Sequence, residues 1–188
     1  MRIRRATRDD ACFIALAVTE ALGGDVMRRG TDGIGRQERH RLDMLADAVR
    51  EDDTLYSWRH TVIAQDGNGM LLGALVAYPG DGYMDMRSRT FSMLNELITF
   101  DVSSMDAEAK AGEYYIDSLA IVPEYRGKGV GTQLLRAAMD EARSSSRIAV
   151  LACAPDNIGA KSMYESLGFR HEGNLFIFGH EYLRMTAE

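Results

Sequence analysis

The chain has 188 residues, which is enough for one domain with a hydrophobic core. Its 46% hydrophobic and 27% charged residues are typical of a globular protein, and a net charge of −6 disfavours nucleic acid as a partner. No apolar run reaches the length of a membrane span, and Asp9 and Asp10 interrupt what would be a signal sequence. The 2 cysteines and 4 histidines lack the spacing of a disulfide framework or a metal site. We therefore expect a single cytoplasmic domain over 1–188, with no metal, no membrane association and no nucleic-acid partner.

The beginning of the chain predicts a strand over 2–6 and a helix over about 9–22. Thr7 is a suitable N-cap for this helix, and Asp10, three positions later, completes a variant of the capping box. Five glycines follow within residues 23–35, so this segment is predicted to be a mobile loop.

The middle of the chain predicts a helix over 36–49 and two strands, 58–65 and 70–78, joined by an Asp-Gly-Asn-Gly hairpin turn. An insertion over 79–112 follows. Apolar residues recur at helical spacing within it: Phe91, Leu94, Leu97 and Ile98.

The second half of the chain predicts a regular alternation of elements. In order they are a strand over 113–122, a helix over 130–143, a strand over 148–153, a helix over about 159–167, and strands near 169–172 and 175–185. Apolar residues four apart give the first of these helices a buried face. Gly168 is well placed to end the second helix.

Residues 126–131 read Arg-Gly-Lys-Gly-Val-Gly and lie between a predicted strand and a predicted helix. The first N–H groups of a helix have no internal partner, and glycine lets the backbone approach a phosphate closely. A P-loop would need a Lys-Ser/Thr pair after the glycines, and a dinucleotide fingerprint would need glycine where Thr132 stands. We expect another phosphate-bearing ligand here, with Arg126 and Lys128 either meeting a phosphate or serving as ordinary exposed charges.

Two spaced blocks resemble motifs of the GNAT superfamily of N-acetyltransferases. The first is R-x-x-G-x-G, formed by Arg126, Gly129 and Gly131; the second is N-x-x-A-x-x-x-Y-x-x-x-G-F, which begins at Asn157. The resemblance is firm over about residues 114–170. It implies an α/β fold with a central mixed seven-stranded sheet and helices on both faces, and it implies acetyl-CoA as the cosubstrate.

The resemblance also implies a binding site for acetyl-CoA. Its expected contacts are Leu119, Ala120, Ile121, Val122, Arg126, Gly127, Lys128, Gly129, Val130, Gly131, Thr132, Asn157, Ala160 and Tyr164. In the family, the strand that ends near Val122 parts from its neighbour, and the pantetheine arm enters the gap. A backbone N–H near Ile121 would polarise the thioester, Asn157 would bond the pantetheine arm, and Tyr164 would protonate the departing sulfur.

The general base is left open by the resemblance. A strand period of two puts Asp117 on one face with Tyr115, Leu119 and Glu113. We expect Asp117 to take the proton of the acceptor ammonium, with Glu113 as an alternative; an ion-paired or solvated carboxylate is the competing interpretation. Cys153 lies in a predicted buried strand and is not expected to act as a nucleophile, so direct attack by the amine is favoured.

We expect an N-acetyltransferase that acts on a primary amine; the alternative is a non-catalytic acyl-CoA-binding or sensor domain of the same fold. Six acids in 96–117 suggest an acidic wall for a cationic small molecule or a peptide amine, and a solvated insertion is the competing interpretation. They are Glu96, Asp101, Asp106, Glu108, Glu113 and Asp117. A homodimer in which the final strand pairs with its copy is a further hypothesis.

Overall fold

The computed structural model describes residues 1–29, 33–98 and 101–188, without the side chain of Arg29. Residues 30–32 of the predicted loop and 99–100 of the predicted insertion lie outside this description. The strands are β1 (Arg2–Arg5), β2 (Thr61–Gln65), β3 (Leu71–Pro79), β4 (Glu113–Ile121), β5 (Ile148–Cys153), β6 (Arg170–Ile177) and β7 (His180–Ala187). The α-helices are α1 (Ala11–Ala21), α2 (Val26–Arg29), α3 (Arg36–Arg50), α4 (Tyr83–Met93), α5 (Val130–Ser144) and α6 (Ile158–Ser166).

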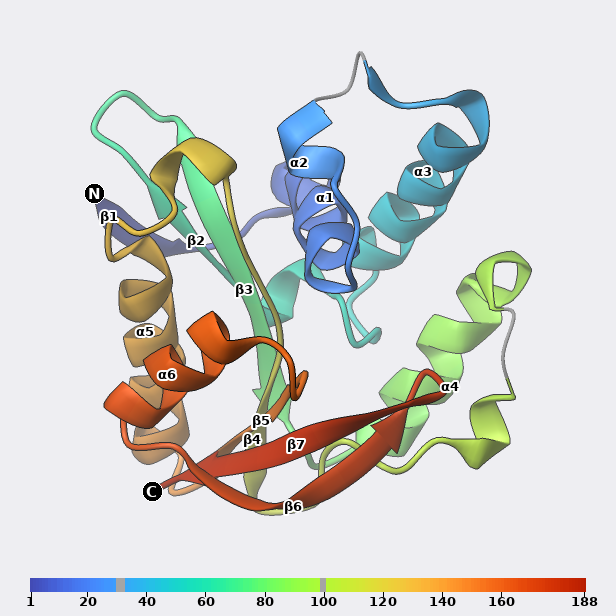
Figure 1. Ribbon diagram of the computed structural model, residues 1–188. Helices are drawn as coiled ribbons and strands as arrows, with labels where there is room; N and C mark the ends of the chain where they lie inside the picture. The colour runs from blue at the N-terminus through green and yellow to red at the C-terminus, as the bar shows by residue number, and fades with distance from the viewer. Residues whose placement is uncertain (30–32, 99–100) are drawn as a thin grey trace.

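The strands form one sheet of seven strands in the order β1-β2-β3-β4-β5-β7-β6 (Figure 1). β4 and β5 run parallel, and the other neighbouring pairs are antiparallel. The predicted mixed seven-stranded sheet is therefore confirmed. The final strand, β7, lies between β5 and β6, so its two edges are already paired. The hypothesis that β7 pairs with a second copy of the chain is wrong, because the sheet ends at β1 and β6.

Helices cover both faces of the sheet and divide the core in two (Figure 1). On one face α1, α3 and α4 pack over residues such as Tyr78 and Tyr115; on the other, α5 and α6 pack over residues such as Ile116 and Leu151. β3 is buried along nearly its whole length because both of its faces are covered. Its sequence accordingly reads as a continuous apolar run.

Local hydrogen bonds explain two differences from the predicted elements. The strand predicted from residue 58 starts at Thr61, because the Ser57 hydroxyl accepts the N–H of Arg59 (3.3 Å) and holds 58–60 in a 3₁₀ turn. The segment predicted as a loop over 23–35 contains the short helix α2, where the N–H of Met27 donates to the carboxylate of Glu20 (3.1 Å).

The last hairpin turns later than predicted. Phe178 and Gly179 adopt left-handed conformations, with φ values of 54° and 79°, and they reverse the chain between β6 and β7. A phenylalanine at positive φ is uncommon, so the turn had no strong signal in the sequence. Residues 173–174, where the break was predicted, are paired with β7, and a register irregularity lies just before them, between His171 and Gly173.

β4 contains a β-bulge at Asp117. Ser118 and Ile116 oppose consecutive residues of β3, which leaves Asp117 as the extra residue. A bulge shifts the alternation of side chains by one position. Tyr115 accordingly packs in the core under α1, whereas Leu119 packs against the core under α5. The prediction that Asp117 shares a face with Leu119 is therefore wrong, because the alternation does not continue through the bulge.

Candidate functional site

The parallel pairing of β4 with β5 ends early. It runs from Glu113 opposite Ile148 to Ile116 opposite Leu151, and β4 then continues alone on this side to Ile121. The bulge at Asp117 begins where the pairing stops, and bulges bend and twist a strand. On its other edge, β5 pairs with β7 from Ala149 to Cys153. Among the described residues, the end of β4 after Ile116 therefore has no strand partner on the side of β5.

A glycine turn follows β4 and leads into α5. Gly129 is the N-cap of α5 at φ 80°, and Gly127 has φ 70°. A Cβ on either would meet no atom within 4 Å, so the left-handed backbone is what requires glycine at both positions. The carbonyl of Gly129 accepts the N–H of Gln133 (3.1 Å), the start of the helical ladder. The N–H groups of 130–132 precede that ladder, and N–H groups at the start of a helix are suited to an anion.

A cleft of about 450 Å³ joins the end of β4, the glycine turn and α6. Its lining consists of Leu119, Ile121, Tyr125, Arg126, Gly127, Gly129, Val130, Gly131, Thr132, Asn157, Ala160, Met163 and Tyr164. Most of the predicted contact residues are thus brought together. Tyr125 and Met163 were missed. Their signals were local, since Tyr125 directly precedes the glycine motif and Met163 follows Ala160 at helical spacing.

Three predicted contact residues do not line this cleft. Ala120 packs in the core on the α1 side of the sheet. The N–H of Val122 donates to the carbonyl of Leu72 (2.9 Å). The ammonium of Lys128 lies over the ring of Tyr125, 5.2 Å from its centroid, which is a cation–π contact.

Arg126 holds the turn against α1. Its Nε donates to the carbonyl of Ile121 (3.0 Å), and its Nη2 forms an ion pair with Glu20 (2.7 Å). The Glu20 carboxylate is mostly buried and also accepts the N–H of Met27. The sequence predicted either a phosphate contact or an ordinary exposed charge for Arg126. It did not indicate the ion pair, because Glu20 is distant along the chain.

Tyr164 and Asn157 reach the cleft from α6. The ring of Tyr164 packs edge-on against Phe169, with centroids 6.0 Å apart, and burial raises the pKa of its hydroxyl to about 12. Tyr164 therefore keeps its proton near neutral pH and is able to donate it. Asn157 caps α6: its side-chain Oδ1 accepts the N–H of Ala160 (3.1 Å). This leaves its Nδ2 group as a donor.

Cys153 is buried at the end of β5. Its thiol donates to the carbonyl of Ala154 (3.4 Å), and burial raises its pKa. A thiol with a raised pKa is a poor nucleophile. This environment agrees with the expectation that Cys153 takes no covalent part.

Asp117 lies at the bulge with its carboxylate half-buried. It accepts hydrogen bonds from the hydroxyls of Tyr78 and Ser118, both at 2.7 Å, but burial raises its pKa overall. Glu113, the alternative base, is ion-paired with Arg184 and accepts the N–H of Lys110. Asp117 is thus the better candidate to accept a proton.

The six acids of the predicted acidic wall have different surroundings. Four have separate partners: Glu96 with His40, Asp101 with Ser103, Asp106 with the backbone of Phe176, and Glu113 with Arg184. Glu108 and Asp117 do interact, because the charge of Asp117 raises the pKa of Glu108. The acidic wall for a cationic acceptor stays a prediction.

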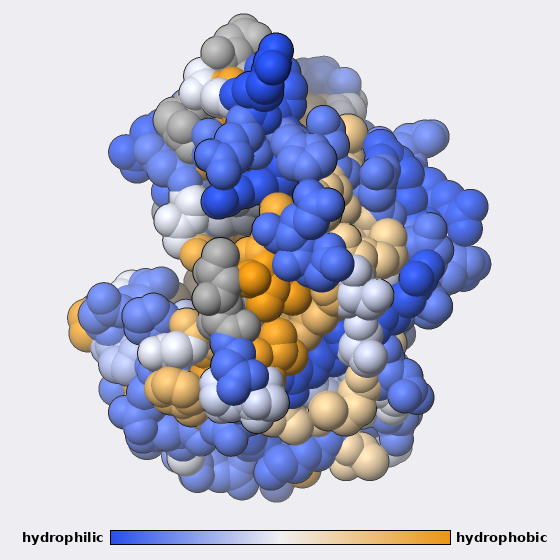
Figure 2. All heavy atoms as spheres, turned by 90° about the vertical axis from the view of Figure 1, so that its right-hand side faces the viewer, coloured by the Kyte–Doolittle hydropathy of each residue, from blue (hydrophilic) through white to orange (hydrophobic). Residues whose placement is uncertain are grey.

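A second cleft lies between the end of α1, α3, α4 and the β6–β7 turn. It has a volume of about 340 Å³, and its lining is largely apolar: Thr19, Leu22, Gly23, Gly24, Arg41, Leu45, Tyr56, Phe91, Leu94, Leu97, Ile98 and Phe178. We call it the apolar cleft. Figure 2 looks onto this side of the molecule and shows hydrophobic atoms along the floor of a hollow between the upper and lower parts.

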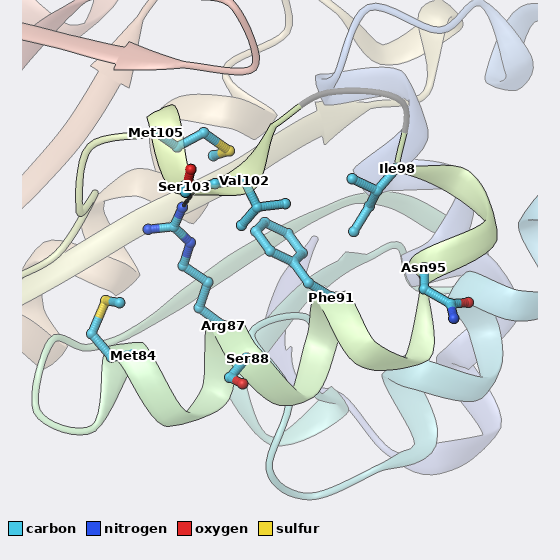
Figure 3. A pocket seen from close by; sticks show the side chains of 9 residues that line it. All are labelled: Met84, Arg87, Ser88, Phe91, Asn95, Ile98, Val102, Ser103 and Met105. Carbon is cyan, nitrogen blue, oxygen red and sulfur yellow. Dashed lines mark hydrogen bonds between the residues drawn. The ribbon is translucent and has the colours of Figure 1, made fainter.

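A larger hollow, of about 630 Å³, lies beside α4 (Figure 3). Arg87 from α4 extends into its wall and donates to the carbonyls of Val102 (2.7 Å) and Asp106 (3.4 Å). The Phe91 ring lies 5.5 Å from the guanidinium carbon. Arg87 therefore fastens the two ends of the insertion together. This hollow includes no residue of the glycine turn and is not the candidate site.

Within 1–29, 33–98 and 101–188, no group of three or more His, Cys, Asp or Glu side chains could hold a metal ion. A search of the same ranges finds no helix with the length and apolar character needed to cross a membrane.

Comparison with curated proteins finds two relatives that match short segments. N-alpha-acetyltransferase 30 of Schizosaccharomyces pombe is 46% identical over 56 residues, which cover 29% of this chain and 37% of that protein. N-alpha-acetyltransferase RimI of Mycobacterium tuberculosis is 36% identical over 61 residues, which cover 32% of this chain and 37% of that protein. The matches thus span little more than a third of either relative.

Solved structures match over the full length. An N-acetyltransferase from Staphylococcus aureus Mu50 has a TM-score of 0.77 at 21% identity, covering 100% of both chains. The crystal structure of another acetyltransferase has a TM-score of 0.75 at 25% identity, covering 100% of this chain and 99% of that one. These likenesses show that the sheet and its helices form the GNAT fold.

The family model for acetyltransferases of the GNAT family matches residues 36–169, more than half of the chain. This range includes β4, the glycine turn and α6, which line the candidate cleft. The chain belongs to the acetyltransferase (GNAT) family, a membership that implies acetyl-CoA as the acetyl donor.

Proposed function

We propose that this protein transfers the acetyl group of acetyl-CoA to a primary amine, and that the amine attacks the thioester directly in a ternary complex. One observation carries the proposal: the unpaired end of β4, the glycine turn and Tyr164 line a single cleft. This arrangement combines an anion-binding terminus, a strand edge for an extended ligand and a phenol that can donate a proton.

The residues present fit coenzyme A. The N–H groups at the start of α5 suit its pyrophosphate, and a cleft lined by Leu119, Ile121 and Met163 suits the pantetheine arm, with Asn157 as a donor to its amides. Arg126 contributes by fixing the turn to Glu20. The backbone donor near Ile121 would stabilise charge on the thioester oxygen, an effect worth about 3–4 kcal/mol in enzymes with such donors.

The ammonium of the acceptor loses two protons in the reaction. With an ordinary pKa of about 10.4, it loses the first to the carboxylate of Asp117, and its nitrogen then forms a bond to the acetyl carbon. As the carbon–sulfur bond breaks, the Tyr164 hydroxyl donates its proton to the leaving sulfur, and the nitrogen gives up its second proton to solvent as the amide forms. The phenolate of Tyr164 then regains a proton from solvent, and Asp117 returns its proton to solvent, so one proton is released for each ammonium that is acetylated.

The acceptor that suits the structure best is a peptide amine with apolar residues beside it. The apolar cleft has Leu45, Phe91 and Leu94 among its walls, and its charged group is the cation of Arg41. Among the described residues that line this cleft there is no carboxylate to act as a counter-ion for the second charge of a polyamine. The two curated relatives are named N-alpha-acetyltransferases, which agrees with an amino group at the end of a peptide.

The alternative is a domain that binds acyl-CoA without turnover. Tyr164 packs against Phe169, a contact that would also suit a residue of the core. Such a domain predicts binding of acetyl-CoA but no release of free thiol with any amine.

Two measurements test the proposal. Calorimetry with acetyl-CoA measures binding, and an assay of thiol release compares peptides with apolar N-terminal residues against a polyamine. We expect turnover with the peptides and a 10²-fold or greater loss of kcat in Tyr164→Phe, at roughly unchanged acetyl-CoA affinity. Tyr114→Phe, a buried phenol on β4 outside the cleft, is the matched control. Equal activity of Tyr164→Phe and wild type would remove Tyr164 from the mechanism, and binding without thiol release would support the alternative.

A further inference from the structure

Glu108 is a buried carboxylate that the insertion carries back to the sheet. Glu108 is only 6% exposed, and its carboxylate accepts hydrogen bonds from the hydroxyls of Tyr115 (2.8 Å) and Tyr83 (3.1 Å). Tyr83 opens α4 and Tyr115 lies on β4, so Glu108 connects the two ends of the insertion to the strand that carries Asp117. A carboxylate in this position is costly to bury unless it has a function or a compensating partner.

Glu108 and Asp117 belong to one cluster of tyrosines. Tyr78 donates to Asp117, and its ring lies 5.9 Å from the ring of Tyr115, which donates to Glu108. Burial, followed by the charge of Asp117, raises the pKa of Glu108 to about 7. Two carboxylates coupled in this way bind and release protons as a pair rather than as separate groups.

Tyr56 lines the apolar cleft and responds to the charge of this pair. Its residue is 5% exposed. Across the ranges that the structure describes, its hydroxyl makes no hydrogen bond, and the oxygen is not fully buried. Burial raises the pKa of Tyr56, and the charges of Asp117 and Glu108 raise it further. A hydroxyl of this kind at the wall of a cleft is suited to a ligand group such as an ammonium.

We infer that Glu108 and Asp117 act as a single proton-accepting pair for the ammonium group of the acceptor, which reaches them from the apolar cleft beside Tyr56. The inference rests on the proposed function and deepens it. One proton leaves the ammonium and binds a carboxylate oxygen of the pair, and the amine keeps the electron pair with which it attacks. Glu108 is a positioning residue, because it acts through Asp117: its negative charge makes Asp117 a stronger base.

Groups from every element around the pair bear on its titration. They are Tyr56 before β2, Tyr78 on β3, Tyr83 and Arg87 on α4, Tyr115 on β4 and Tyr182 on β7. The hydroxyls of Tyr83 and Tyr115 and the charge of Arg87 favour the ionised form of Glu108, whereas burial and Asp117 oppose it. Removing a group that favours the ionised form should raise the pKa of Glu108, and removing the charge of Asp117 should lower it.

The test is the pH dependence of kcat/KM with a peptide amine. Activity should fall toward acid pH as the pair takes up a proton. Glu108→Gln, which retains hydrogen-bonding capacity toward the tyrosines, should shift this acid limb to lower pH by about one unit, because Asp117 loses a neighbouring negative charge. Tyr83→Phe removes a bond that favours the ionised form and should shift the limb to higher pH. Asp117→Asn should lower the rate by about 10²-fold or more.

Glu96→Gln is the matched control, since Glu96 is an exposed acid of the same insertion. A purely structural role for Glu108 would lower activity without moving the acid limb, and that result overturns the inference while the proposed function stands. If Glu108→Gln does not fold, Tyr83→Phe provides the test. An acid limb of Tyr83→Phe at the same pH as that of the wild type would also overturn the inference. If the wild type releases no thiol with any amine, the proposed function fails, and the inference fails with it.

Discussion

Replacing Gly129 with alanine should expose the cost of the left-handed turn that precedes α5. Gly129 has φ 80° and ψ 2°, and an added Cβ would meet no atom within 4 Å. The penalty is therefore backbone strain without steric overlap, about 1–2 kcal/mol for an L-residue in this region. Gly35, the N-cap of α3, provides a matched control, because it has φ −70° and equally open surroundings. The difference between the two alanine variants isolates the strain from the loss of glycine at an N-cap.

The strain should appear in one of two measurements. If the turn keeps its shape, Gly129→Ala loses about 1–2 kcal/mol of unfolding free energy relative to Gly35→Ala, and acetyl-CoA binds as in wild type. If the turn relaxes, stability is retained and affinity falls by about 5- to 30-fold, which is the same free energy. Urea unfolding of the acetyl-CoA-saturated protein captures both cases. Equal unfolding free energies of the two saturated variants would refute the reasoning that the bound turn requires a left-handed residue.

Two further predictions concern stability. Asp10 accepts two hydrogen bonds from Arg4 (2.7 and 2.8 Å), which lower its pKa. A carboxyl whose pKa is lowered in the folded state stabilises the protein above its unfolded-state pKa, and this stabilisation is lost as the pH falls through the folded-state pKa. Urea unfolding at a series of pH values should show this loss, and Asp10→Asn should reduce it. An unchanged dependence of the unfolding free energy on pH in Asp10→Asn would contradict the assignment. Gly80→Ala would put a Cβ 2.0 Å from the carbonyl oxygen of Lys110, where the insertion returns to the sheet, so we expect it to lower the unfolding free energy by about 1–3 kcal/mol. Gly67→Ala is the control and should change little, because its Cβ would meet no atom within 4 Å. Equal unfolding midpoints for the two variants would argue against close packing at Gly80.

Features that depend on neighbours in sequence were predictable. The glycine turn and the start of α5 each follow from residues within one helical turn of one another. The mixed seven-stranded sheet followed from a family resemblance built on two such local blocks. β5 begins and ends as predicted, because a short buried run between polar segments marks its limits in sequence.

Features that depend on distant residues were not predictable in this way. The bulge at Asp117 reverses the facing of every later side chain of β4, and it is visible only in the register with β3. Arg126 meets Glu20 across 106 positions of the chain. The tight neck at Gly80 and Lys110 returns the insertion to the sheet.

The sequence by itself determined the glycine turn and the helix start that suit an anion, since helix termini and turns follow from local backbone chemistry. The expectation that Tyr164 donates a proton came from the family resemblance. The tertiary structure decided which acids influence one another's pKa and which are engaged elsewhere. The physical reason is that a carboxylate's pKa depends on its burial and on the charges packed around it. For Glu108 those neighbours come from α4, β4 and β7, which meet only when the sheet is complete.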